Sequence, residues 1–370
     1  MTLDASLSNW LEIDLEAIRR NADRLRRLTG VRLMAVVKAG AYGHGLAQAA
    51  RAALRGSAEW LGVARIDEGL DLRRAGIGAP GLILGHTPDD RLAEAIEAEL
   101  RLTVWSAEHL DAAAAVAARL DTSARVHLKV DTGMNRIGAA PEDAMTLARR
   151  AADSPNLAFE GIYTHFACAD ELVRRPTEAQ VAVFNQVIEA LSASGLRPEL
   201  THAANTAAAL AYPEARWDMV RSGIGIYGMH PSDAVRLPDD FEPALAWKSR
   251  LTMVKVVASG QGVSYGHEYV TSRAERIGTV PVGYGDGFRR VNGNRVLVRG
   301  RVVPVVGRVC MDQCLVQLDD VPEAVSGDEV VLIGEQAAAR ITAEQVAACW
   351  GTINYEVTCG ITERVRWIYR

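Results

Sequence analysis

Short apolar runs alternate with segments of helical character over the first two thirds of the chain. The runs have the length of β-strands, whereas the segments between them are rich in alanine, arginine and glutamate. Eight runs are predicted to form strands: Leu33–Val37, Trp60–Ala64, Leu82–Leu84, Leu102–Trp105, Val126–Val130, Phe159–Thr164, Leu200–His202 and Met219–Gly223. Predicted helices include Asp67–Ala75, Ala107–Leu120 and Glu178–Ser194. Strands and helices that alternate over about 225 residues predict a (β/α)8 TIM-type barrel, although doubly wound sheets share this alternation.

The pattern changes near Phe241, where valine-rich runs separated by glycine and aspartate turns begin. These runs predict a β-rich domain. Its expected strands are Leu251–Val257, Arg276–Val282, Arg295–Val298, Val302–Val306, Cys314–Gln317 and Glu329–Ile333. The segment 231–243 contains three prolines and several acidic residues, which favours a boundary there. We therefore expect a barrel over residues 9–238 and a β-rich domain over residues 239–370, with residues 1–8 as a candidate addition to the second domain.

Composition argues against several classes of function. The 370 residues carry a net charge of −5, so no basic surface for nucleic acid is indicated. No apolar stretch reaches the ~18 residues of a membrane-spanning helix, and the first residues do not resemble a signal peptide. The five cysteines do not suggest a disulfide framework, and Cys310 and Cys314 have no second pair at zinc-ligand spacing. We expect a cytoplasmic protein with no metal site and with neither nucleic acid nor a membrane as partner.

Lys38 is the most informative single residue. It ends an apolar run, and a loop of small residues that carries Tyr42 and His44 follows it. A lysine amine held in a partly desolvated pocket has a lowered pKa, because burial disfavours its charged form. A neutral amine can form a Schiff base, which is how pyridoxal phosphate is held. A solvated surface lysine is the simpler alternative.

Further polar residues lie at or beyond the carboxyl ends of the other predicted strands. Ligands of a barrel bind at the carboxyl ends of its strands, so these residues would meet at one face. They are Lys129, Asp131, Arg136, His165, His202, Asn205, Thr206 and Arg221. Each alone has a structural explanation, but together they predict a ligand site.

The segment 223–228 spells G-x-G-x-x-G, the pattern of dinucleotide-binding loops. Pro231 and Pro238 follow too soon for the crossover helix that such a loop requires. We therefore favour a phosphate site built from backbone N–H groups, to which Thr206 would add a hydroxyl.

Nine segments carry a resemblance to one family. They are K-A-G-A-Y-G-H-G at 38–45, K-V-D-T-G-M-N-R-I-G at 129–138, T-H-F-A at 164–167, N-T at 205–206, V-R-S-G-I at 220–224, V-S-Y-G at 263–266, V-G-Y-G-D-G at 282–287, G-R-V-C-M-D-Q at 307–313 and N-Y-E at 354–356. In this order and spacing the chain resembles the alanine racemases over nearly its whole length. One position departs from the family pattern, because Gly40 stands where Asn or Asp is usual.

The resemblance implies pyridoxal 5′-phosphate as the cofactor and alanine as the substrate, racemised by two bases acting on the aldimine of the two. Lys38 corresponds to the Schiff-base lysine and first base. Tyr265 corresponds to the second base, which in this family reaches into the active site of the partner subunit. The resemblance thus implies an isomerase that works as a homodimer with composite active sites and supplies D-alanine for peptidoglycan.

Other residues match family positions that contact the cofactor or the substrate. Arg221 matches the arginine that faces the pyridine nitrogen, and His202 matches its support. The remaining matches to the cofactor and phosphate pocket are Tyr42, His165, Asn205, Thr206, Gly223, Ile224 and Tyr355. Arg136 and the backbone N–H of Met311 match anchors of the substrate carboxylate. Lys129 matches a lysine that is carbamylated in many members, and an unmodified, ion-paired lysine is the alternative.

Three alternative functions remain at this stage. The nearest is a racemase of the same family with a different or broader amino-acid specificity. A non-catalytic pyridoxal-phosphate-binding protein would need only the barrel, so the second domain argues against it. A decarboxylase of the same fold type would lack the segments around Tyr265 and Arg221.

Overall fold

The computed structural model describes residues 8–370, which form two compact units. One unit comprises residues 16–242, and the other combines residues 8–15 with residues 243–370. Residues 1–7 lie outside the described residues, so the expected addition of residues 1–8 to the second domain can be followed only at Ser8. Its carbonyl oxygen accepts a 2.6 Å hydrogen bond from Ser249 Oγ of the second unit.

The first unit is built on a closed barrel of parallel strands, so the predicted fold class is confirmed. Its strands are β2 (Arg32–Val36), β3 (Trp60–Val63), β4 (Gly81–Ile83), β5 (Leu100–Val104), β6 (Ala124–Lys129), β7 (Leu157–Tyr163), β8 (Leu200–His202) and β9 (Met219–Ser222). Each strand pairs with the next, and β9 pairs with β2 to close the barrel. All eight strands lie where the apolar runs predicted them, within one or two residues at each end.

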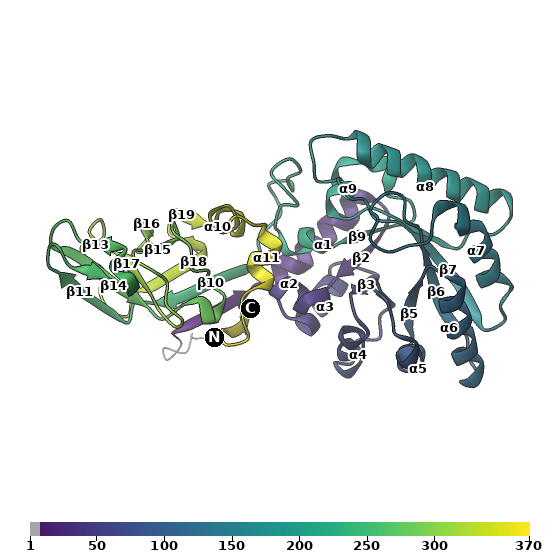
Figure 1. Cartoon of the computed structure of the whole chain (residues 1–370), viewed down its shortest axis with the longest axis horizontal. Helices are drawn as coiled ribbons and strands as arrows, with labels where there is room; N and C mark the ends of the chain where they lie inside the picture. Colours follow the sequence, from purple (N-terminus) through teal and green to yellow (C-terminus); the bar gives the residue numbers. More distant parts are fainter. Residues whose placement is uncertain (1–7) are drawn as a thin grey trace. The chain divides into compact units, whose positions relative to one another are not determined.

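Helices follow the strands and surround the barrel (Figure 1). They are α1 (Leu15–Thr29), α2 (Lys38–Gly43), α3 (Leu46–Arg55), α4 (Ile66–Arg74), α5 (Leu92–Glu97), α6 (Ala107–Arg119), α7 (Ala144–Asp153), α8 (Arg175–Ala193) and α9 (Thr206–Ala211). Short 3-10 helices are η1 (Asp89–Arg91), η2 (Pro141–Asp143), η3 (Pro213–Ala215) and η4 (Ile224–Tyr227). Within residues 8–370, none of the helices has the length and apolar character needed to span a membrane.

The interior of the barrel has an apolar part and a polar part. Its apolar part is a buried cluster of Met34, Trp60, Leu82, Tyr163, Leu200 and Met219. Tyr163 links the two parts, because its hydroxyl bonds Thr103 Oγ1 at 2.9 Å while its ring stacks on His202 with 4.8 Å between ring centroids. This close packing gives the polar residues near the strand ends a rigid support.

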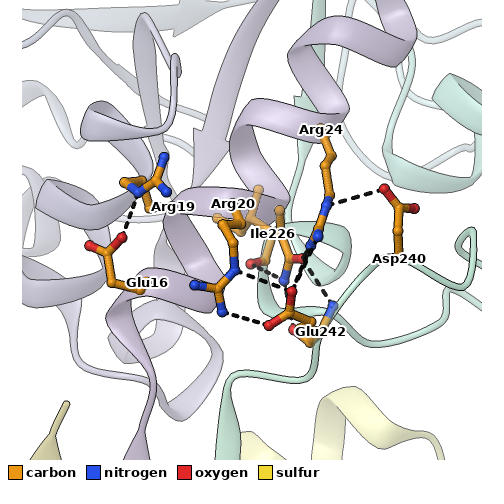
Figure 2. A network of polar contacts seen from close by, with 8 residues as sticks. Glu16, Arg19, Arg20, Arg24, Ile226, Asp240 and Glu242 are labelled. Atoms are coloured by element: carbon orange, nitrogen blue, oxygen red, sulfur yellow. Dashed lines mark hydrogen bonds and ion pairs between the residues drawn. The ribbon is translucent and has the colours of Figure 1, made fainter.

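The last residues of the barrel unit are fastened to α1 by a polar network (Figure 2). Arg20 Nη2 and Arg24 Nη1 donate to the Glu242 carboxylate at 2.5 and 3.2 Å, and Arg24 also pairs with Asp240 at 3.2 Å. Asn21 Nδ2 donates to the carbonyl oxygens of Ile226 and Glu242 at 3.3 and 2.7 Å. The unit therefore extends to residue 242, four residues beyond the end at residue 238 that the prolines suggested.

The second unit holds β1 (Asn9–Ile13), which the sequence placed in the barrel domain. β1 pairs antiparallel with β10 (Leu245–Arg250) and parallel with β20 (Arg366–Tyr369). These partners lie more than 230 residues further along the chain, as in the pair of Asn9 with Ser249. A run of five residues does not indicate which sheet it joins, so local pattern alone missed this pairing.

Apart from β1, β10 and β20, the second unit contains short strands and helices. They are β11 (Met253–Val257), β12 (Gly262–Val263), η5 (Tyr265–His267), β13 (Tyr269–Val270), β14 (Glu275–Val280), η6 (Tyr284–Asp286), β15 (Arg295–Val298), β16 (Arg301–Pro304), β17 (Cys314–Gln317), β18 (Glu329–Gln336), β19 (Ala339–Ile341), α10 (Ala343–Trp350) and α11 (Asn354–Cys359). The largest sheet has the order β16-β15-β18-β10-β1-β20, with β19 paired to β18, and two smaller sheets have the orders β11-β14-β17 and β12-β13. The prediction of a β-rich domain is confirmed.

Candidate active site

Lys38 follows β2 and begins a left-handed turn. The four residues from Ala39 to Tyr42 all have φ between 53° and 60° and ψ between 35° and 52°. Such angles are rare for residues with a side chain, because the Cβ approaches the following carbonyl. At Gly40, with φ of 60°, no Cβ exists to cause this strain. Glu68 Oε1 accepts a 2.7 Å hydrogen bond from the Ala39 N–H, which fastens the turn directly after Lys38.

Tyr42, the last left-handed residue of this turn, packs closely against Gly223. A Cβ at Gly223 would lie 2.2 Å from Tyr42 Oη, so the hydroxyl can approach the backbone only because residue 223 is glycine. Ile224 begins η4 directly after Gly223, and Thr206 begins α9 nearby. Thr206 Oγ1 bonds Ser222 Oγ at 2.9 Å, which holds the two segments together. The Thr206 hydroxyl thus links the start of α9 to the segment that begins η4.

Asn205 serves this region as a cap rather than as a free side chain. Its Oδ1 accepts a 2.9 Å hydrogen bond from the N–H of Ala208, as expected for the residue that precedes a helix. The cap fixes the start of α9, and it thereby fixes Thr206.

Arg221 lies on β9 with its guanidinium almost fully buried. Its Nη1 donates to His202 Nδ1 at 2.9 Å, and its Nη2 donates to the carbonyl oxygens of Thr164 and Ala203 at 2.8 Å and to His165 Nδ1 at 3.0 Å. The guanidinium also lies 5.0 Å from the centroid of the Tyr163 ring. Burial lowers the pKa of Arg221 to about 10, so the group stays cationic at neutral pH.

His165 and His202 are held neutral beside Arg221. Burial, followed by the charge of Arg221, keeps the pKa of both imidazoles well below the usual value of 6.5. Arginine has no acceptor atom, so each histidine must accept through the nitrogen that faces it. The proton of each neutral ring therefore sits on Nε2.

Lys129 is a buried lysine of the barrel unit with a strongly lowered pKa. It is 4% exposed at the end of β6, and burial together with the charges of Arg136, Arg221 and Lys38 lowers its pKa to about 7. The same charges show that these three cations lie near Lys129. Its ammonium lies 5.6 Å from the centroid of the Tyr163 ring.

Arg136 lies on an exposed loop that Asp131 organises. Asp131 Oδ1 accepts hydrogen bonds from the N–H groups of Gly133, Met134 and Asn135 at 2.9–3.0 Å, and Oδ2 accepts one from the Arg136 N–H at 3.1 Å. Burial by itself would raise the pKa of Asp131, but these four donors keep it below its usual value. The carboxylate thus fixes the backbone from which Arg136 projects.

The other predicted residues, Tyr265, Met311 and Tyr355, belong to the second unit. Tyr265 begins η5 and its side chain is 66% exposed, while Met311 is 53% exposed. Tyr265 borders a pocket of about 470 Å³ that Ser264, Cys310 and Gln313 also line. Ser264 Oγ donates to the Arg308 carbonyl oxygen at 2.6 Å, which fixes the turn that presents Tyr265. Tyr355 lies on α11 and is partly buried.

Within the barrel unit, the structure gathers Lys38, Lys129, Arg136, His165 and Arg221, as the charge interactions at Lys129 and His165 show. Sequence reasoning missed several residues that lie behind this group inside the barrel. The ring of Tyr163 lies against Arg221 and Lys129, and Thr103 bonds the Tyr163 hydroxyl. His127 bonds His202, and Glu160 bonds His127 in turn. One signal for His127 existed, because it lies two residues before Lys129 on a strand and so faces the same side.

The comparisons with known proteins cover both units. A family model described as alanine racemase, N-terminal domain, matches residues 13–231, and one described as alanine racemase, C-terminal domain, matches residues 244–369. The chain is 46% identical to an alanine racemase of Symbiobacterium thermophilum over 100% of this chain and 99% of that protein. It is 44% identical to one of Desulfovibrio desulfuricans over 97% of each chain.

Solved structures agree with these relatives. An alanine racemase of Clostridium difficile superposes with a TM-score of 0.94 at 39% identity, over 99% of this chain and 97% of that chain. One of Streptomyces coelicolor superposes with a TM-score of 0.94 at 40% identity, over 100% and 99%. Two matched family models and full-length relatives well above 30% identity lead to one conclusion: the chain belongs to the alanine racemase family.

Proposed function

We propose that this chain is an isomerase that interconverts L-alanine and D-alanine with pyridoxal 5′-phosphate as its cofactor. The observation that carries the proposal is the buried Arg221, which is held between two neutral histidines at the carboxyl end of the barrel strands, close to Lys38 and Lys129. Family membership supports the substrate class, a small amino acid.

The residues present fit this cofactor. The Tyr42 hydroxyl, which lies against Gly223, and the Thr206 hydroxyl would bind the phosphate. Ile224 would add its backbone N–H, and Asn205 would fix the start of α9. The amine of Lys38 would carry the aldehyde carbon. When bound, pyridoxal 5′-phosphate supplies the electron sink that makes the Cα proton of the amino acid acidic.

Arg221 would donate a hydrogen bond to the ring nitrogen and keep its own proton, because guanidinium is not deprotonated in a protein. His165 would lie near the ring, with its acceptor nitrogen occupied by Arg221. This arrangement limits the charge that the ring can take up, which favours rapid return of the proton to Cα over side reactions.

Two bases on opposite faces of Cα would exchange the proton. Lys38 Nζ would take or return it on one face, and Tyr265 Oη would do so on the other. Arg136 and the backbone N–H of Met311 would bind the substrate carboxylate, and Tyr355 would line the cofactor pocket. The exposure of Tyr265 and Met311 in the single chain supports their use in a site that a second copy completes.

A homodimer is therefore part of the proposal. Large apolar side chains of the second unit are strongly exposed in the single chain, and a partner subunit would remove them from water. They include Met253, Val256, Val270, Val302 and Ile353, each between 47% and 62% exposed. If the sites are composite, dilution below the dimer dissociation constant must remove activity, and a fully active monomer would contradict this part.

Lys129 would carry a carbamate. Its pKa of about 7 leaves much of the amine neutral and reactive toward CO2 at neutral pH. The product is an anion, which the guanidinium groups of Arg136 and Arg221 would stabilise, and it would hold Arg136 in place. The unmodified lysine would instead add to a group of like charges.

A cytoplasmic location and a role in supplying D-alanine for peptidoglycan complete the proposal. All five cysteines of the chain lie in the described residues, and none of them forms a disulfide, as is usual for proteins of reducing compartments.

The deciding experiment incubates purified protein with a panel of L- and D-amino acids in D2O and follows Cα exchange and chirality. We expect exchange and inversion with both enantiomers of alanine. Exchange with other amino acids as fast as with alanine would replace the specific assignment by a broad-specificity racemase, and no exchange with alanine would overturn it.

A further inference from the structure

Arg221 is a buried cation that no carboxylate of residues 8–370 contacts. Its polar partners among residues 8–370 are two neutral imidazoles and two carbonyl oxygens. A buried charge is costly unless its surroundings compensate it. A row of hydrogen bonds that begins at His202 connects Arg221 to a carboxylate, that of Glu160.

The row runs through the barrel interior from β9 to β7. His202 Nε2 lies 2.9 Å from His127 Nδ1, and His127 Nε2 lies 3.2 Å from Glu160 Oε2. Arg101 closes the row, because its Nε and Nη2 donate to the Glu160 carboxylate at 3.0 and 3.3 Å. His127 and His202 are both fully buried, and the side chains of Glu160 and Arg101 are 19% and 12% exposed.

Only one direction of donation satisfies every group in this row. Arg221 can only donate, so His202 accepts at Nδ1 and carries its proton on Nε2. His202 then donates to His127 Nδ1, and His127 donates from Nε2 to Glu160. Burial lowers the pKa of both histidines, which keeps them neutral. Burial would raise the pKa of Glu160, but its bonds to His127 and Arg101 lower it to about 2, so it is the anion that ends the row.

The backbone is adapted to this row. The register of β6 and β7 shifts at this point, since Val126 is opposite Phe159 and His127 is opposite Gly161, so Glu160 is an extra residue in its strand. Such a bulge re-aims a side chain. A Cβ at residue 161 would lie 2.4 Å from His127 Nδ1, so the imidazole occupies space that only glycine leaves free. Trp60 packs against the same ring with 5.5 Å between centroids.

We propose that Glu160 and His127 are positioning residues of the racemase: they hold His202 in the tautomer that accepts from Arg221 and thereby fix the guanidinium against the cofactor ring. The proposal rests on the proposed function for its kinetic consequence but not for its structural one. Without the carboxylate, His127 and His202 can both change tautomer. A protonated His202 Nδ1 would then face the N–H of Arg221 Nη1. Two buried donors that face each other leave both without an acceptor, which disfavours the present position of Arg221.

The direct test is the tautomeric state of the two rings. Full-length protein labelled with ¹⁵N-histidine is compared, by long-range ¹H–¹⁵N correlation, with Glu160→Leu and Glu160→Gln, and the signals are assigned with His127→Gln and His202→Gln. In the unaltered protein we expect a bare Nδ1 and a protonated Nε2 on both rings. Glu160→Leu should move the Nδ1 signals of both rings, His202 included, although residue 160 does not touch it.

Glu160→Gln keeps an acceptor for His127 and so should keep both tautomers. It should still shift the Nε2 proton of His127, because a hydrogen bond to a neutral amide is weaker than one to a carboxylate. An unchanged His202 spectrum in Glu160→Leu would overturn the proposal. If Glu160→Leu does not fold, an unchanged chemical shift of the His127 Nε2 proton in Glu160→Gln would overturn the proposal equally.

Kinetics separate positioning from mere folding. Glu160→Leu should lower kcat for alanine about 10- to 100-fold with little change in KM, as loss of a supporting partner does behind other functional side chains. Glu160→Gln should recover most of that loss. The matched control is Glu59→Gln, which removes a barrel-unit carboxylate that pairs with Arg26 at 3.2 Å, and it should leave kcat unchanged. If the unaltered protein does not exchange the Cα proton of alanine, the proposed function is wrong. The tautomers of His127 and His202 would then still test whether Glu160 controls the row of hydrogen bonds.

Discussion

Replacing Gly40 tests how the turn after Lys38 is held. Gly40 is also the position at which this chain departs from the family pattern, and the angles of the turn favour glycine there. The turn requires φ of 60° and ψ of 35° at this position. Glycine adopts these angles without strain. Asparagine, one of the two residues that the family resemblance gives as usual here, tolerates them better than most residues with a side chain. We predict the stability order glycine, then asparagine, then alanine, then valine.

The magnitudes follow from the backbone alone, because a Cβ at Gly40 would meet no atom within 4 Å. A left-handed conformation disfavours an ordinary residue by about 1–2 kcal/mol. We expect Gly40→Asn to lower the free energy of unfolding by about 0.5 kcal/mol and Gly40→Ala by about 1 kcal/mol. Gly40→Val should lower it by about 2 kcal/mol, since a β-branched residue fits this region least well.

The assay is urea unfolding of the barrel unit followed by tryptophan fluorescence, together with kcat and KM for alanine. Gly78→Ala is the matched control, because Gly78 also has open space around its Cβ position but lies outside the left-handed region. That control should be neutral or gain up to about 1 kcal/mol. An alanine variant at residue 40 as stable as the unaltered protein, or an asparagine variant that loses as much as valine, would refute the account of the turn.

Three further predictions concern the chemistry of the site. Tyr265→Phe should bind pyridoxal 5′-phosphate normally, seen in its absorbance, but lose about 10²-fold or more of Cα exchange; retained exchange would remove Tyr265 from the mechanism. Arg221→Glu should keep the cofactor but increase the formation of pyridoxamine 5′-phosphate during incubation with alanine. The reason is that a carboxyl group can transfer a proton to the ring nitrogen and guanidinium cannot. No increase would count against the role of Arg221. The pKa of Lys129 is lowered from 10.5 to about 7, so its reactive neutral form grows as the pH rises through about 7. A carbamate signal from ¹³C-bicarbonate should grow in that range and be missing in Lys129→Met, and a signal that the variant retains would assign it elsewhere.

The sequence by itself determined the barrel and many of the residues of its site. The eight apolar runs predicted the strands because a strand that is buried on both faces consists almost entirely of apolar residues. The helical segments between them form the connections that parallel strands require. Polar residues at or just beyond the carboxyl ends of these runs gather at one end of a barrel, so Lys38, Lys129, His165 and Arg221 could be named from the sequence.

Only the tertiary structure decided what depends on distant partners or on backbone angles. β1 joins the second unit because its partners lie near both ends of the chain's last third, which no local pattern records. The left-handed turn at Gly40 is invisible in a list of residue types. Glu160 and His127 look like an ordinary surface carboxylate and an ordinary buried histidine in the sequence. A bulge in β7 and the missing side chain of Gly161 bring them into line with His202 and Arg221, because hydrogen-bonded rows are set by ångström distances between strands and not by spacing along one strand.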